Sequence, residues 1–291
     1  MYIDFLYAKM EPFKSKLTIR LNTKAESLVV EKGRVSGVLV VSDQGTEVLR
    51  AKAVILATGG YGSNRDMIKR YSPKYSEVMT VTLPFATGDG HRMAAAVGAD
   101  LVNMDYICAY FGGMPKAPGQ YAIGFGDLTS GAADGWKGEI WVNQRGERFI
   151  NEDDGDEDPR EMALNEQPDL ENFIIFDQGM VDFNKRFPIG GFEKRLEENG
   201  YAVKKADTIE ELCKAFGLPV AQVKREIAAV NGDHSAGKTD RFGKKPAIGF
   251  TKGPYYGILN RGTIFMTQGG IRTDIGMRVL DKNGQIGRAH V

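Results

Sequence analysis

The stretch Ala53-Val-Ile-Leu-Ala-Thr-Gly-Gly60 constrains the fold of this chain most strongly. The consecutive apolar residues Val54–Leu56 lack polar alternation, which is typical of a strand covered on both faces in a parallel sheet, although so short a run also fits a buried helix. Gly59 and Gly60 favour the strand, because bare backbone at its carboxyl end lets a phosphate or ribityl chain approach closely. The alternative is an ordinary tight turn after a core strand.

A second glycine cluster follows about thirty residues later, in Ala86-Thr-Gly-Asp-Gly-His-Arg-Met-Ala-Ala-Ala-Val-Gly98. Thr87 or Asp89 is expected to cap a helix there. Its first turn would present free N–H groups beside Gly88 and Gly90, which attract an anion or polar cofactor atoms, while the Asp89 carboxylate accepts hydrogen bonds from a ligand. A capped helix without a ligand is the alternative.

Composition excludes several classes of protein. The chain has 291 residues, 42% of them hydrophobic, and a formal net charge of zero, so it can form a large core and lacks the basic surface of a nucleic-acid binder. No apolar run is long enough to cross a bilayer. Cys108 and Cys213 are expected to be free thiols. His91, His234 and His290 lack ligand spacing, are expected at the surface or in caps, and predict no metal site.

The first fifty residues predict a helix followed by an antiparallel meander. Apolar spacing within residues 1–16 suggests part of a helix and not a signal peptide. Four strands are expected, and the meander feeds directly into the Val54–Leu56 strand. The expected strands are Leu17–Leu21, Ala25–Val30, Val35–Val41 and Thr46–Arg50.

Further motifs complete a pattern that resembles a known flavoprotein family. The motifs are Ala51 to Asn64, Ala86 to Gly90, Trp141 to Glu152, Lys238 to Gly243, Gly253 to Tyr256 and Met266 to Asp274. Their order resembles that of the family containing soluble fumarate reductases, fumarate reductase and succinate dehydrogenase flavoprotein subunits, and 3-ketosteroid dehydrogenases. The likeness covers nearly the whole chain and implies FAD as cofactor.

The resemblance implies an α/β (α+β) fold with two domains. Residues 1–111 and 251–291 would form a partial FAD-binding domain with a parallel sheet and the meander, and residues 112–250 an inserted α+β capping domain. The family's Gly-x-Gly-x-x-Gly segment and its carboxyl-terminal segment have no counterpart here, so we expect an internal fragment or truncated product. The ending Gly287–Val291 fits no family pattern.

Local signals describe the expected capping domain. Glycine and proline between 112 and 126 indicate a hinge or loop region. The acidic run Glu152–Asp158 is expected to be a solvated loop, with a hard-cation site as the alternative. Glu171–Asp177 predicts a strand, Thr208 opens a capping box for a helix to Phe216, and another helix runs from Pro219 to Asn231-Gly232.

The resemblance implies hydride transfer between the flavin and a carbon next to an electron-withdrawing group. Trp141 to Glu152 resembles the hairpin that starts the family's capping domain. Soluble fumarate reductases use an arginine after the Asn-Glu of this hairpin as proton donor, which makes Arg160 the catalytic candidate here; the alternative, a surface arginine balancing the acidic run, is favoured. Met266 replaces the family's fumarate-binding histidine, and Thr129–Gly135 diverges as well. An apolar or aromatic substrate suits four residues, although for each of them a place in the core is the favoured interpretation: Tyr106, Tyr110, Phe265 and Met266.

The same resemblance implies a set of cofactor contacts. Ala25 would read the adenine edge through its backbone, Ala57 to Gly59 would line the adenosine and pyrophosphate side, and Asp89, Thr267 and Gln268 would approach the flavin. Each also fits ordinary turn chemistry. The full set is Ala25, Ala57, Thr58, Gly59, Gly60, Thr87, Gly88, Asp89, Gly90, Thr267 and Gln268.

The leading hypothesis is a fragment of an FAD-dependent oxidoreductase acting on CH–CH groups. Its partners would be a small enoate or enone substrate and an electron donor, with no nucleic acid and no membrane span, in the cytoplasm or, for a full-length parent, the periplasm. Two alternatives stay open: a cofactor-free, non-catalytic domain, or a domain that binds FAD only when another chain supplies missing segments.

Overall fold

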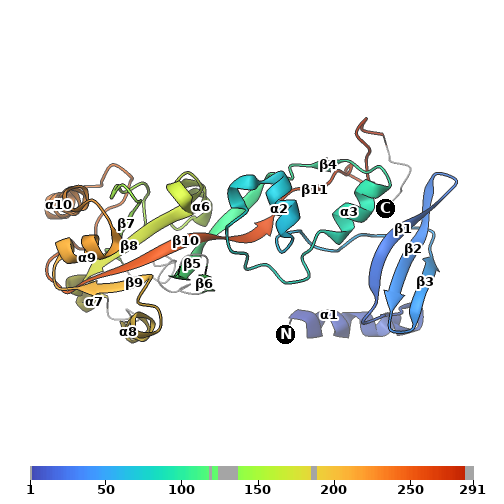
Figure 1. The fold of residues 1–291 in the computed structure, drawn as a ribbon, viewed down its shortest axis with the longest axis horizontal. Coiled ribbons are helices and arrows are strands. Elements are labelled where there is room, and N and C mark those ends of the chain that lie inside the picture. The colour runs from blue at the N-terminus through green and yellow to red at the C-terminus, as the bar shows by residue number, and fades with distance from the viewer. Residues whose placement is uncertain (1, 118–119, 124–136, 185–188, 286–291) are drawn as a thin grey trace. The chain divides into compact units, whose positions relative to one another are not determined.

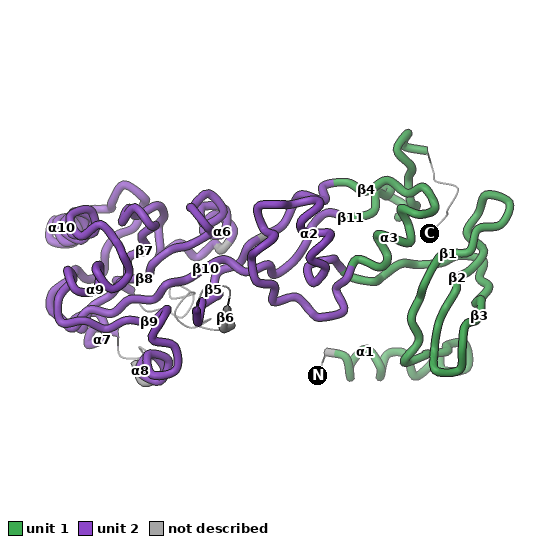
Figure 2. Tube along the Cα trace, viewed as in Figure 1, with its two compact units in different colours: residues 1–59, 88–102, 270–291 green, residues 60–87, 103–269 purple. Residues whose placement is uncertain are grey.

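The computed structural model describes residues 2–117, 120–123, 137–184 and 189–285, and these residues form two compact units. Unit 1 comprises residues 1–59, 88–102 and 270–291, and unit 2 comprises residues 60–87 and 103–269 (Figure 2). The expected boundary at 111/112 falls inside a strand of unit 2, and that at 250/251 falls in the same unit. Thr129–Gly135 and Gly287–Val291 lie outside the described residues.

Unit 1 contains the meander that the sequence predicts. Strand β1 (Lys24–Glu31) pairs antiparallel with β2 (Arg34–Ser42), which pairs antiparallel with β3 (Gly45–Arg50). Gly33, at φ 78°, allows the tight turn between the first two strands. The remaining elements of unit 1 are α1 (Tyr2–Met10), the 3₁₀ helix η1 (Glu11–Lys16), α3 (Asp89–Ala96), β4 (Leu101–Val102) and β11 (Gly270–Ile271).

Two expected strands of unit 1 are not formed. Leu17–Leu21 is irregular, and its alternating apolar residues are exposed instead of paired. Val54–Leu56 is not in a strand either, and Ile55 is 88% exposed. A central strand needs neighbours on both sides for its N–H and C=O groups. None of the described residues pairs with this segment, and every ladder between named strands is antiparallel, so the expected parallel sheet is absent from the described part.

Unit 2 is built on one mixed-length antiparallel sheet (Figure 1). The strands follow the order β6 (Gln120–Ile123), β5 (Ile107–Ala117), β10 (Tyr255–Thr267), β8 (Glu171–Asp177) and β7 (Ile140–Val142). Strand β9 (Val203–Ala206) also pairs with β10. The long β10 joins this sheet together, since its first half pairs with β8 and its second half with β5.

The helices of unit 2 follow local sequence signals. Thr208 and Glu211 form the predicted capping box of α9 (Ile209–Phe216). Helix α10 (Val220–Ala236) begins after Pro219 but runs past the expected end at Gly232. The others are α2 (Arg65–Tyr71), η2 (Pro73–Tyr75), α6 (Glu157–Asn165), η3 (Pro168–Leu170), α7 (Gln178–Phe183) and α8 (Ile189–Glu198).

The largest core of the described chain lies in unit 2. All seven residues of β8 are buried, and the rings of Phe176, Phe192 and Tyr256 contact one another with centroids 5.1–5.5 Å apart. Burial of such rings provides most of the driving force for folding. Among the described helices, none combines the length and apolarity that crossing a membrane requires.

Candidate functional site

The turn after Val54–Leu56 is open in unit 1. Ala57, Thr58 and Gly59 are exposed, and Gly59 has φ 71°, a conformation that favours glycine. A Cβ placed on Gly59 would meet no atom within 4 Å, whereas one on Gly90 would lie 2.1 Å from Thr58 Oγ1. The predicted glycine motifs therefore meet: the open turn packs against the start of α3, and only a residue without a side chain fits at position 90.

Helix α3 begins differently from the prediction. Its N-cap is Gly88, at φ 74°, and no side chain caps it. Asp89 is the first helical residue and forms an ion pair with Arg92, while Thr87 Oγ1 donates to Phe85 O at 3.4 Å. The expected caps Thr87 and Asp89 are thus wrong, because a left-handed glycine already ends the preceding turn.

Two hollows in unit 1 collect the candidate cofactor residues. One is lined by Lys24 to Leu28 together with Asp89, Arg92 and Met93, so Ala25 and Asp89 share it. The other, of about 590 Å³, is lined by Ile55 to Gly59, His91 and residues of the carboxyl-terminal segment from Ile271 to Val279. His91 is 7% exposed, so its expected surface position is wrong.

In unit 2, Gly60 and Thr267 lie against each other. A Cβ on Gly60 would be 2.4 Å from Thr267 Oγ1, and that oxygen accepts a hydrogen bond from the Tyr61 N–H at 3.2 Å. Tyr61 is fully buried, and its hydroxyl donates to Met104 O. Burial raises the pKa of this phenol to about 12, so it remains a hydrogen-bond donor at physiological pH.

The turn from Tyr61 to Asn64 brings Thr87 to the same region of unit 2. Asn64 Nδ2 donates to Thr87 O at 2.8 Å, and Asn64 Oδ1 caps α2 by accepting from Met67 N at 3.1 Å. The Gln268 backbone N–H donates to Tyr106 O at 3.0 Å, and the Gln268 side chain is exposed. The predicted residues Gly60, Thr87, Thr267 and Gln268 therefore belong to one fixed framework.

Arg160 is buried, contrary to the favoured surface interpretation. The side chain is on α6 and 2% exposed, and its Nε and Nη1 have no hydrogen-bond acceptor. Its guanidinium carbon lies 5.8 Å from the centroid of the Trp141 ring. None of the described carboxylates forms an ion pair with it, so this cation is held by an aromatic face.

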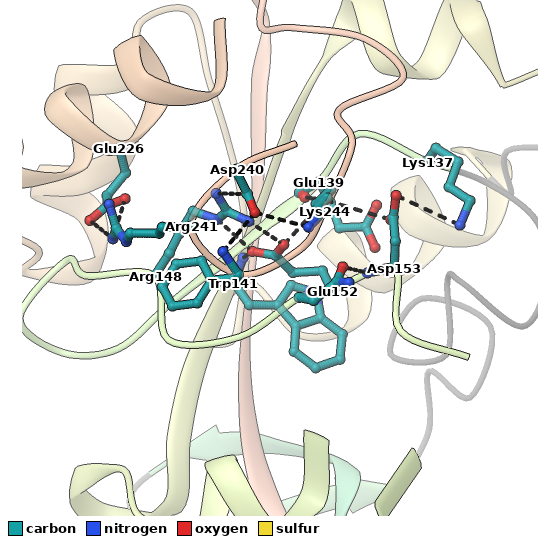
Figure 3. Close-up of polar contacts among 12 residues, drawn as sticks. Lys137, Glu139, Trp141, Arg148, Glu152, Asp153, Glu226, Asp240, Arg241 and Lys244 are labelled. Carbon is teal, nitrogen blue, oxygen red and sulfur yellow. Dashed lines mark hydrogen bonds and ion pairs between the residues drawn. The ribbon is translucent and has the colours of Figure 1, made fainter. Parts of the chain in front are cut away.

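A buried charge cluster lies at the base of the hairpin in unit 2 (Figure 3). Arg148 binds Glu152 through two hydrogen bonds, of 2.8 and 2.7 Å, and also donates to Asp240 at 2.7 Å. Lys244 Nζ lies 3.2 Å from Glu152 Oε2 and 3.6 Å from Asp153 Oδ1. The expectation of a solvated acidic loop is therefore wrong for Glu152, which is fully buried.

Glu139 occupies the same cluster without a hydrogen bond to either carboxylate oxygen. Lys244 Nζ donates instead to the Glu139 backbone oxygen, at 2.6 Å. Burial raises the pKa of Glu139 to about 7, although the charge of Lys244 opposes the shift. Burial would also raise the pKa of Glu152, but Lys244 and Arg148 outweigh it and hold that pKa below its usual value.

Apolar side chains are exposed where β5 and β10 pair. Tyr106 is 60% exposed, Phe265 51% and Met266 44%, so the core interpretation is wrong for these three. The rings of Tyr110 and Phe265 lie 5.5 Å apart. The exposed Phe265 ring thus lies beside the half-buried Tyr110 ring.

Sequence reasoning missed several residues of these sites. Tyr61 follows the glycine pair directly, and its position after Gly-Gly was the available signal. Lys244 gave no signal, since its partners Glu139, Glu152 and Asp153 are about ninety or more residues away. In the described part of the chain, Cys213 is a free buried thiol, and no group of three or more acidic, histidine or cysteine side chains could hold a metal.

Comparison with known proteins connects these sites to a family. The family model described as FAD binding domain matches residues 4–287. A probable fumarate reductase, Ifc3 of Shewanella frigidimarina, is 32% identical over 90% of this chain and 42% of its own length. Vinyl phenol reductase of Lactiplantibacillus plantarum is 31% identical over 96% of this chain and 62% of its own.

Solved structures show the same similarity. The open conformation of a flavocytochrome c3 fumarate reductase matches 99% of this chain and 48% of its own, with a TM-score of 0.65 and 30% identity. The 3-ketosteroid delta1-dehydrogenase of Sterolibacterium denitrificans matches 97% of this chain and 55% of its own, with a TM-score of 0.77 and 25% identity. The chain thus spans less than two thirds of each of these proteins.

Proposed function

This chain belongs to the FAD binding domain family, and from that premise we propose that it is part of a flavin-dependent oxidoreductase. The reaction is hydride transfer to or from a C–C bond next to a carbonyl or carboxylate. Similar proteins named fumarate reductase, urocanate reductase and 3-oxosteroid 1-dehydrogenase support this reaction class. An electron-donor partner and a substrate-capping role for residues 112–250 belong to the same proposal.

The contact between Gly90 and Thr58 carries the proposal. A helix start packed this tightly on an open Thr-Gly turn leaves backbone groups accessible to a ligand, and a Cβ on Gly59 would meet no atom within 4 Å. These residues fit a dinucleotide-sized cofactor better than an isolated tight turn, because that alternative gives no reason for the adjoining hollow of about 590 Å³.

The residues of unit 1 would hold the FAD through backbone and small side chains. Ala57, Thr58 and Gly59 would contact it from the open turn, Gly88 and Gly90 from the start of α3, and Ala25 with Asp89 from their shared hollow. Gly60, Thr87, Thr267 and Gln268 belong to unit 2 and stay cofactor candidates from the sequence resemblance alone. When bound, the flavin supplies the hydride acceptor and donor.

Arg160 is our candidate for the charged group on the substrate side. Two nitrogens of its buried guanidinium, Nε and Nη1, have no acceptor, so their N–H groups remain able to bind an electron-rich substrate atom or to deliver a proton to it. The exposed Phe265 ring, next to the half-buried Tyr110 ring, supports an apolar or aromatic portion of the substrate. An enoate or enone carrying such a group combines both features.

Titration of the purified chain with FAD, followed by flavin absorbance, tests the proposal. We expect saturable binding, and weaker binding by Gly90→Ala, whose added Cβ would displace Thr58. Gly155→Ala is the matched control, because no atom lies within 4 Å of the added Cβ. No binding by the unmodified chain at high FAD would refute the enzyme assignment for this chain.

One observation favours the second candidate, a domain that binds FAD only with a further polypeptide segment. Val54–Leu56 has no strand partner among the described residues, and Ile55 is 88% exposed. A strand of this composition is normally covered on both faces. FAD binding that requires addition of another segment in trans would support this candidate over the first.

A further inference from the structure

The positive charge of Arg160 is buried, and its desolvation has to be offset by a neighbouring group. The side chain is 2% exposed, and its Nε and Nη1 have no acceptor. Removing an uncompensated cation from water costs several kcal/mol, so proteins normally pair it with a carboxylate. The nearby cluster contains four carboxylates, from Glu139, Glu152, Asp153 and Asp240, yet none of them forms an ion pair with Arg160 among the described contacts.

Trp141 is the group that faces this cation. Its ring is fully buried, and the distance of 5.8 Å from its centroid to the guanidinium carbon is within the range of a cation–π interaction. The electron-rich face stabilises the positive charge without accepting any N–H hydrogen. The indole N–H is itself a donor without an acceptor, so it cannot accept a hydrogen bond from Arg160 as a carboxylate would.

The position of the indole is fixed by contacts from two sides. The Trp141 backbone N–H donates to Glu152 Oε1 at 2.9 Å, and this is the same oxygen that accepts from Arg148 Nε (Figure 3). The Phe111 ring lies edge-on to the indole, with centroids 4.8 Å apart. The buried ion pair thus anchors the strand that carries the ring, and the ring in turn defines where the guanidinium lies.

We propose that Trp141 is a positioning residue that holds Arg160 charged and buried while leaving its N–H groups free for the reactant. The inference rests on the proposed function of Arg160. An arginine paired with a carboxylate would have those N–H groups occupied. An aromatic face supports the guanidinium and leaves them open.

The contact is tested by NMR of the chain labelled with ¹⁵N-arginine. The Arg160 Nε–H signal, assigned by its loss in Arg160→Lys, should be shifted upfield by the ring current of the indole. Trp141→Phe, which keeps an aromatic face, should retain an upfield shift, and Trp141→Leu should lose it. Phe176→Leu is the matched control for loss of core volume and should leave the signal unchanged. An Arg160 signal that does not move in Trp141→Leu would overturn the proposal.

Kinetics separate this inference from the proposed function. With the enoate urocanate as probe, Trp141→Leu should lower kcat about tenfold with little change in KM, and Trp141→Phe should recover most of it. In an Arg160→Gln background, Trp141→Leu should have no further effect on kcat. Additive losses would contradict positioning. Full activity of Arg160→Gln would instead refute the proposed role of Arg160, whatever the NMR result.

Discussion

Arg148 and Glu152 form a bidentate ion pair in which both side chains are at most 2% exposed. A buried pair of this geometry is stable only while both members are present, because either charge alone is left desolvated. Lys244 and Asp240 extend the pair, so the hairpin and the loop from Asp240 to Lys244 depend on the same charges.

Lys244→Met is therefore expected to destabilise the chain by about 3–5 kcal/mol, since it leaves Glu152 and Asp153 short of a buried cation. Urea denaturation measures the loss. Lys224→Met is the control: Lys224 and its partner Glu210 are about half exposed, so water screens that pair and its loss should change the free energy of unfolding little. Equal losses in the two variants would contradict the assignment of a buried cluster.

Glu139→Gln should change how stability depends on pH. The folded chain holds the Glu139 proton up to about pH 7, whereas the unfolded chain releases it near its ordinary pKa of 4.5. The free energy of unfolding therefore falls as pH rises from about 4.5 to 7, by about 3 kcal/mol, and this contribution is constant above that range. Glu139→Gln should flatten the slope and be more stable than the parent at pH 8. Parallel pH profiles from urea melts at pH 5 to 8 would be inconsistent with a protonated Glu139.

Gly60→Ala should destabilise unit 2 by about 1–3 kcal/mol, because the new Cβ would come within 2.4 Å of Thr267 Oγ1. Combining it with Thr267→Gly removes the clashing hydroxyl and should restore part of the loss. Thermal denaturation of the single and double variants measures the coupling. Strictly additive effects would mean that the two residues are not in contact.

Cys213 should resist alkylation in the folded chain. It is fully buried, and burial raises the pKa of its thiol to about 11, so little thiolate exists at pH 8. Peptide mapping after iodoacetamide treatment should find Cys213 unmodified without denaturant and modified in urea. Rapid modification of the folded chain at pH 8 would contradict its buried position.

The features that could be predicted correctly are those formed by residues close together in the sequence. The capping box at Thr208 and the meander through β3 require only local hydrogen bonds, and both are confirmed. Val54–Leu56 failed as a strand because pairing depends on a neighbour that no local pattern supplies. Glu152 and Arg160 were expected at the surface because their side chains are charged. Glu152 is buried against Lys244, and Arg160 against Trp141, and neither contact can be read from the local sequence.

The pairing of β10 also determines where unit 2 can yield to mechanical load. Residues Tyr255–Arg261 keep an unbroken register with β8, so force along this half is shared by many hydrogen bonds in shear. Against β5 the register shifts twice, between Arg261 and Thr263 and between Ile264 and Met266. The ladder is therefore regular at the start of the strand and interrupted toward Phe265 and Thr267, where each irregularity leaves a residue out of the pairing.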